Sequence, residues 1–200
     1  MHFTYLDFPA IPADLESKIL SIVDSHLHSN ANRTGLNIEA SDAVVNAIEN
    51  TSYNLADSLG LPIEESWKDF NSVAKFDFLD APTEVINWVI ENIDKNVGYV
   101  SIQVMHSGSI ITPHIDEVRS YAYNYILTAN NGITSFYKPT SKYEHLKAYA
   151  KTYFPYDRLA LIEEVKIDAS RWHRLPTQTI HGVTNLDPAL KRISLSLSFL

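Results

Sequence analysis

Apolar and polar positions change their period near residue 96 of the chain. Before this point, apolar residues recur every three or four positions, which predicts helices; beyond it they mostly alternate with polar residues, which predicts strands. The first helix is expected after Pro12 and the second from Ser41. The third is expected from Pro82, because proline suits the first turn of a helix. A strand is predicted over 73–79, between the last two helices.

Eight strand-like segments follow in the second part of the chain, separated by turns and by one longer insertion. They run over 98–106, 110–115, 121–128, 133–138, 159–167, 172–175, 179–184 and 192–199. The insertion contains 143–153, for which we expect a short helix. Eight short strands without crossover helices suit two antiparallel sheets packed face to face.

The expected fold is therefore mainly β with flanking helices: a double-stranded β-helix, the jelly-roll or cupin-like arrangement, preceded by N-terminal helices. We expect a single domain over 1–200. In this interpretation 97–200 forms the jelly-roll core, and 1–96 forms a helical support against one outer face.

Charge and composition restrict the classes of function. The chain of 200 residues has a net charge of −8 and no cysteine, which excludes disulfides, thiolate metal ligands and a cysteine nucleophile. An acidic chain without a basic stripe disfavours nucleic acid as a partner. We find no leader-like N-terminus and no apolar run of membrane-spanning length, so a cytoplasmic protein is the expectation.

Three residues have the chemistry of a metal site. His114 and Asp116 are two positions apart at the end of a predicted strand, so their side chains point to the same face. In a jelly roll the second and seventh strands are neighbours, which brings His181 beside them across a gap of 67 residues. Two imidazoles and one carboxylate suit Fe(II) and similar divalent ions.

The last predicted strand carries a possible anchor for an acid. Arg192, Ser194, Ser196 and Ser198 share one of its faces, and a guanidinium inside a sheet needs a partner. A dicarboxylic acid can supply that partner through a bidentate pair with Arg192 and a hydrogen bond from Ser194. The alternative is an internal ion pair with an acid such as Asp187. Lys191 would face the other way.

The order His-x-Asp, His and Arg-x-Ser over eight strands resembles the Fe(II)/2-oxoglutarate-dependent oxygenase superfamily. The resemblance covers roughly 98–199; Pro113-His-Ile-Asp116 is similar to its first signature, and His181 with Arg192-Ile-Ser194 to its second, although Met105 stands in place of the usual tyrosine. Hydroxylases of aspartyl and asparaginyl residues, and small bacteriophage oxygenases, are the nearest in style.

This resemblance implies a dioxygenase with Fe(II), 2-oxoglutarate as co-substrate and O2. His114, Asp116 and His181 would be the iron ligands and the catalytic centre, and Arg192, Ser194 and Asn124 would bind 2-oxoglutarate. The reaction would be the hydroxylation, or another oxidation, of a small molecule, an amino acid or a peptide side chain.

Several roles stay open at the level of sequence. Arg119 either orients Asp116, anchors an anionic substrate or is a solvated turn residue, and His173 competes with His181 as a ligand without being followed by the Arg-x-Ser strand. Contacts of Arg119, Trp172, His173 and Arg174 with a substrate are not decided.

Two other functions also remain. One is a cupin-type metalloenzyme that does not use 2-oxoglutarate, which would need a further ligand such as Gln103 or His173. The other is a non-catalytic jelly-roll binding protein whose histidines only pack. Neither the substrate nor the oligomeric state can be read from the sequence.

Overall fold

The computed structural model describes residues 2–29, 76–105, 111–117, 119–128, 132–140, 146–148, 151–154, 158–184 and 190–199. Its helices are α1 (Ala13–Ser29) and α4 (Thr83–Asn92). Its strands are β1 (Thr4–Tyr5), β2 (Phe76–Asp80), β3 (Val97–Met105), β4 (Ile111–Asp116), β5 (Tyr121–Ile126), β6 (Ile133–Pro139), β7 (Leu146–Ala148), β8 (Lys151–Tyr153), β9 (Leu159–Lys166), β10 (Trp172–Pro176), β11 (Ile180–Thr184) and β12 (Arg192–Phe199).

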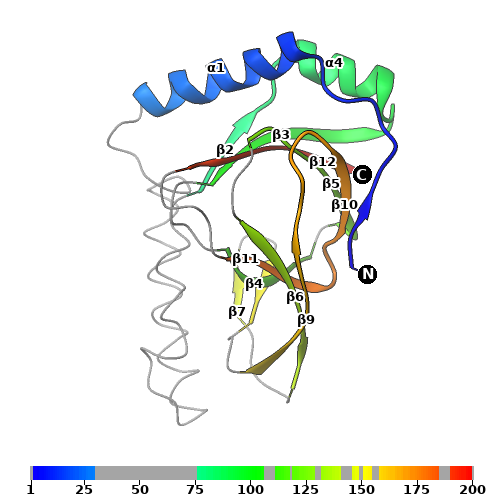
Figure 1. Cartoon of the computed structure of the whole chain (residues 1–200), viewed down its shortest axis with the longest axis vertical. Helices are drawn as coiled ribbons and strands as arrows, with labels where there is room; N and C mark the ends of the chain where they lie inside the picture. The colour runs from blue at the N-terminus through cyan, green and yellow to red at the C-terminus, as the bar shows by residue number, and fades with distance from the viewer. Residues whose placement is uncertain are drawn as a thin grey trace.

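The strands form two six-stranded antiparallel sheets that face each other (Figure 1). Sheet A has the order β1-β10-β5-β12-β3-β2, and sheet B has the order β7-β8-β4-β11-β6-β9. The eight strands predicted from the sequence supply β3, β12, β5 and β10 to one sheet and β4, β11, β6 and β9 to the other. This alternation is the jelly-roll order, so the predicted fold class is confirmed.

The main core lies between sheet A and the two helices, which run across its outer face in Figure 1. Ile19 and Val23 of α1 and Val85 and Val89 of α4 are fully buried there. The helices present these residues at a spacing of four, which places each pair on a single stripe. The helices α1 and α4 thus pack on one outer face of sheet A. The helix expected from Ser41 lies outside the described residues.

The opposite faces of the same strands point between the sheets and are more polar. On β12, Ile193, Leu195 and Leu197 pack toward the helices, whereas Arg192 and Ser194 face sheet B. Strand period makes these two faces alternate. The core therefore holds one side of sheet A rigid while the other side is left for polar chemistry.

The helix expected over 143–153 is wrong where the structure describes this segment. Leu146–Ala148 and Lys151–Tyr153 are instead a pair of short strands, and β8 pairs with β4 through His114↔Tyr153 and Asp116↔Lys151. Without them β4 would be an edge strand with unpaired backbone groups, and pairing satisfies these groups. Local helix propensity yields to this long-range requirement.

Neither described helix is long and apolar enough to cross a membrane.

Candidate functional site

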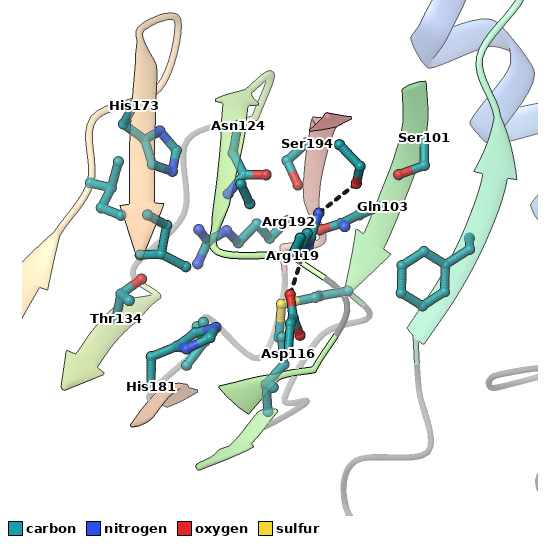
Figure 2. A pocket seen from close by; sticks show the side chains of 18 of the residues that line it. Ser101, Gln103, Asp116, Arg119, Asn124, Thr134, His173, His181, Arg192 and Ser194 are labelled. Carbon is teal, nitrogen blue, oxygen red and sulfur yellow. Dashed lines mark hydrogen bonds and ion pairs between the residues drawn. The ribbon is translucent and has the colours of Figure 1, made fainter. Parts of the chain in front are cut away.

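A pocket of about 250 Å³ lies between the two sheets. The six residues that the sequence predicts for the site all line it: His114, Asp116 and His181 from sheet B, and Asn124, Arg192 and Ser194 from sheet A. Figure 2 shows the two sides, with His181 and Asp116 facing His173, Asn124 and Ser194 across the pocket. The strand order of the jelly roll is what brings these distant segments together.

His114 and His181 are direct neighbours on adjacent strands. They are register partners in the antiparallel pair β4–β11, and their ring centroids lie 4.4 Å apart with an angle of 46° between the ring planes. Both side chains are buried. Nδ1 of His181 lies 2.8 Å from the carbonyl oxygen of Thr179. Since a carbonyl only accepts, Nδ1 carries the proton of the neutral ring, and Nε2 is left with the lone pair that a metal requires.

Asp116 is buried on the same face as His114, two positions further along β4. Its Oδ1 lies 3.7 Å from Nε2 of His114. Two donors bound to one ion at right angles, with bonds of about 2.1 Å, would lie about 3 Å apart. The pair is therefore within about an ångström of the separation that a shared ion would need.

The donor set of two imidazoles and one carboxylate suits Fe(II). In the part of the chain that the structure describes, no three His, Asp or Glu side chains converge closely enough to enclose an ion as they stand. The burial of the three side chains and the position of the His181 proton on Nδ1 are compatible with this donor set.

Arg192 is the most unusual charged group in the pocket. It is only 8% exposed, and burial lowers the pKa of its guanidinium to about 10. Among the described residues, no carboxylate forms an ion pair with it; Asp187, the alternative partner, lies outside them. As the strand alternation predicts, Arg192 faces the pocket and Lys191 is exposed. Ser194 follows two positions later on the same face.

Asn124 and His173 lie side by side across the β5–β10 pair. Oδ1 of Asn124 is buried and accepts no hydrogen bond from the described residues. Burial, and then the positive charge of Arg192, lower the pKa of His173 to about 3, so its ring is neutral at ordinary pH. His173 belongs to sheet A and stands across the pocket from the His114–His181 pair, which places it away from the predicted ligands.

The other residues whose roles the sequence left open differ in whether they line the pocket. Trp172 is buried in the core against the helices and donates from Nε1 to the carbonyl oxygen of Pro9, 2.9 Å away. Arg174 stacks over the ring of Tyr121, with its guanidinium carbon 4.7 Å from the centroid. Neither lines the pocket, whereas Arg119 does.

Two residues near the site escaped the sequence analysis. Gln178 donates from Nε2 to the carbonyl oxygens of Asp116, at 2.5 Å, and of Arg119, at 3.1 Å. Thr177 donates from its hydroxyl to the Arg119 carbonyl oxygen, at 2.5 Å. Their position just before His181 was the available signal, but a polar turn residue is most often solvated, and only the fold shows which turn it meets.

No protein-family model and no curated protein sequence matches the chain. An oxidoreductase of the 2OG-Fe(II) oxygenase family from Burkholderia pseudomallei is 13% identical, with 62% of this chain and 65% of that chain covered and a TM-score of 0.39. The Escherichia coli ribosomal oxygenase YcfD is 12% identical over 58% of this chain and 27% of that chain, with a TM-score of 0.38.

An oxalate oxidase is 15% identical over 62% of this chain and 50% of that chain, with a TM-score of 0.34. This chain thus spans less than two thirds of the length of each of these three proteins. At such values the matches say nothing about its chemistry.

Proposed function

We propose that this chain is an Fe(II)- and 2-oxoglutarate-dependent oxygenase. The observation that carries the proposal is the shared pocket: the His114–His181 pair and Asp116 on one wall, and the buried Arg192 with Ser194 on the other. A metal centre alone would not require a buried guanidinium that lacks a carboxylate partner among the described residues. A metal centre that works with a dicarboxylate co-substrate would.

His114, Asp116 and His181 would hold the iron. Bound Fe(II), together with 2-oxoglutarate and O2, would supply the oxidation of a C–H bond, with 2-oxoglutarate converted to succinate and CO2. The contribution of the chain is to hold these ligands in place on β4 and β11 and to bury them, since an ion in a dry, shaped pocket is protected from side reactions.

Arg192 and Ser194 would bind the far carboxylate of 2-oxoglutarate. A guanidinium forms two parallel hydrogen bonds with a carboxylate, and such charge-assisted bonds are short and strong. Burial has already removed water from Arg192, so an incoming carboxylate finds a charge whose desolvation cost is largely met by the fold. Asn124 and the neutral His173 would add hydrogen-bonding groups of no net charge along the same wall.

The substrate of this reaction would be a small molecule, an amino acid or a peptide side chain. An acidic chain of net charge −8 has little to offer a phosphate backbone, which disfavours nucleic acid. We further propose that 1–200 acts as one domain, with the N-terminal helices stabilising sheet A behind the pocket.

Anaerobic addition of Fe(II) and 2-oxoglutarate to the apo protein tests the proposal directly. We expect the weak visible charge-transfer band of the chelate in the wild type. His114→Ala should lose it, and Arg192→Ala should need far more 2-oxoglutarate to form it. Arg174→Ala is the matched control, because it removes an arginine that does not line the pocket.

The other outcomes identify the alternatives. Fe(II) binding without the band would indicate a cupin-type metal centre that does not use 2-oxoglutarate. No Fe(II) binding at all would leave a non-catalytic jelly-roll protein, and the proposal would have to be abandoned.

A further inference from the structure

Arg119 is placed between the two sheets at the edge of the pocket. Its Nε lies 2.6 Å from Oδ2 of Asp116, which belongs to sheet B. Its Nη1 donates to the hydroxyl of Ser198, at 2.9 Å, and makes a longer contact of 3.4 Å with that of Ser196, both on β12 of sheet A. In Figure 2 one dashed line runs from Arg119 to Asp116, and another runs from Arg119 toward sheet A. One side chain thus connects Asp116 to the opposite sheet.

The backbone of Arg119 is also held by hydrogen bonds. The carbonyl oxygen of Arg119 accepts hydrogen bonds from Thr177 and Gln178, and Gln178 also donates to the carbonyl oxygen of Asp116. The amide of Asp116 donates to the carbonyl oxygen of Thr177, 2.9 Å away. The turn after β4 and the turn before β11 are therefore joined, and these are the turns next to Asp116 and His181.

The two oxygens of the Asp116 carboxylate have different neighbours. Oδ2 is the oxygen paired with Arg119, whereas Oδ1 is the oxygen that lies 3.7 Å from Nε2 of His114. Nε of Arg119 holds Oδ2 of Asp116 through a charge-assisted contact, and Nη1 of the same planar group is held by Ser198, so rotation of the carboxylate would break this contact. Oδ1 then stays on the side of the histidine pair.

We propose that Arg119 is a positioning residue, which fixes Asp116 so that it offers a single oxygen, Oδ1, to a metal shared with His114 and His181. The inference rests on the proposed function and deepens it. Arg119 would act through Asp116 and would not itself touch the metal. Because Arg119 contacts Asp116 on sheet B and Ser198 on sheet A, it also links the position of β4 to sheet A and to the core between sheet A and the helices.

The opposite role for Arg119 is competition, in which its positive charge takes the place of a metal on Asp116. The two roles predict opposite changes in metal affinity when Arg119 is replaced. Removing a positioning residue lowers metal affinity, and groups that orient metal ligands typically contribute about 10- to 100-fold to it. Removing a competitor raises metal affinity.

The experiment measures Mn(II) affinity and the Fe(II)–2-oxoglutarate absorption band in the wild type and in Arg119→Gln, Arg119→Lys, Ser198→Ala and Arg174→Gln. We expect Arg119→Gln to lose about 10- to 100-fold in Mn(II) affinity and to shift or broaden the band. Arg119→Lys, which keeps the charge but not the fork, should recover part of the loss. Ser198→Ala removes one hydrogen bond to Arg119 and should lose about three- to tenfold.

Arg174→Gln removes the same charge from a position that does not line the pocket and should leave both readouts unchanged. Wild-type affinity in Arg119→Gln would overturn the inference while leaving the proposed function intact, and a higher affinity would assign Arg119 to competition. A wild type that binds no metal overturns both. If Arg119→Gln fails to fold, as judged by circular dichroism, an unchanged affinity in Ser198→Ala overturns the inference instead.

Discussion

His181 faces His114 directly across the β4–β11 ladder, with 4.4 Å between the ring centroids. The two residues are 67 positions apart in sequence, so only the jelly-roll order of strands makes them neighbours. Both imidazoles are buried and line the pocket between the sheets. Under the proposed function, one metal ion would bind both rings.

If one ion binds both rings, replacing either histidine should remove most of the binding. We expect His114→Ala and His181→Ala each to lose more than about 100-fold in Mn(II) affinity, because even residues outside the ligand set cost about 10- to 100-fold. The double variant should bind no worse than either single variant, since the site is lost in one step. Isothermal titration calorimetry on the three variants gives the comparison; losses that simply add would contradict a common ion.

The sequence predicted this pair because strand period and jelly-roll order are properties of the pattern of residues. All eight segments appear as strands, and β12 covers 192–199 as expected. The β7–β8 hairpin could not be predicted, since it exists only through its pairing with β4, more than 30 positions away in the chain. The two-residue strand β1 likewise exists only beside β10.

Some features of the candidate site could likewise be predicted from the local sequence pattern, whereas others depend on the fold. Strand alternation was enough to place Arg192 and Ser194 on the pocket face and Lys191 on the surface. Asp116 was one of the partners that the sequence offered for Arg119, but the contact with Ser198 could not be read from it, because Ser198 lies 79 positions further along the chain. Their meeting depends on how the β4–β5 turn sits against sheet A.

Arg192 should cost stability in the absence of a ligand. Its guanidinium is buried, and no described carboxylate compensates for it, so an apolar residue of similar length removes a desolvated charge. We expect Arg192→Met to unfold at the same temperature as the wild type or higher when no ligand is present. A structural ion pair at Arg192 would instead make the variant clearly less stable.

When 2-oxoglutarate and a divalent metal are added, the wild type should become more stable than Arg192→Met. A ligand at about 100 times its Kd stabilises the folded state by about 2.7 kcal/mol. The wild type should gain this stabilisation and Arg192→Met should gain little of it. Differential scanning fluorimetry with and without the ligands measures both halves, and Arg174→Met serves as a control outside the pocket.

His173 should make the protein sensitive to acid. Its pKa is about 3 in the folded chain against an ordinary value of 6.5, with burial as the main cause. Between these two pH values the unfolded chain takes up a proton that the folded chain does not. The contribution of the neutral His173 to the free energy of unfolding should therefore be fully present above pH 6.5 and should be lost as the pH decreases toward 3.

Replacing His173 with glutamine removes this titration and keeps a polar side chain beside Asn124. We expect the difference in unfolding free energy between His173→Gln and the wild type to change in favour of the variant as the pH falls from 7 to 4. Urea unfolding at a series of pH values provides the measurement. A difference that stays constant with pH would mean that His173 is not held neutral by the fold.

Gly182 controls how closely β11 approaches β4. A Cβ at this position would lie 2.7 Å from the carbonyl oxygen of Ile111 and 3.4 Å from the amide nitrogen of Pro113, and both are backbone atoms that cannot rotate away. The β4–β11 register is also irregular between His181 and Val183. Gly182→Ala should therefore push the strands apart, at a cost of about 1–3 kcal/mol, and move His181 relative to His114.

The consequence for Gly182→Ala is a loss of metal affinity larger than its loss of stability alone would produce. Val89→Ala is the matched control, because Val89 of α4 is fully buried in the core on the helix side of sheet A, away from the pocket, and its truncation costs stability of similar order. Mn(II) affinity measured well below the unfolding temperature of both variants should fall in Gly182→Ala and stay at the wild-type value in Val89→Ala. Equal affinities would show that the spacing of β4 and β11 at Gly182 does not set the geometry of the histidine pair.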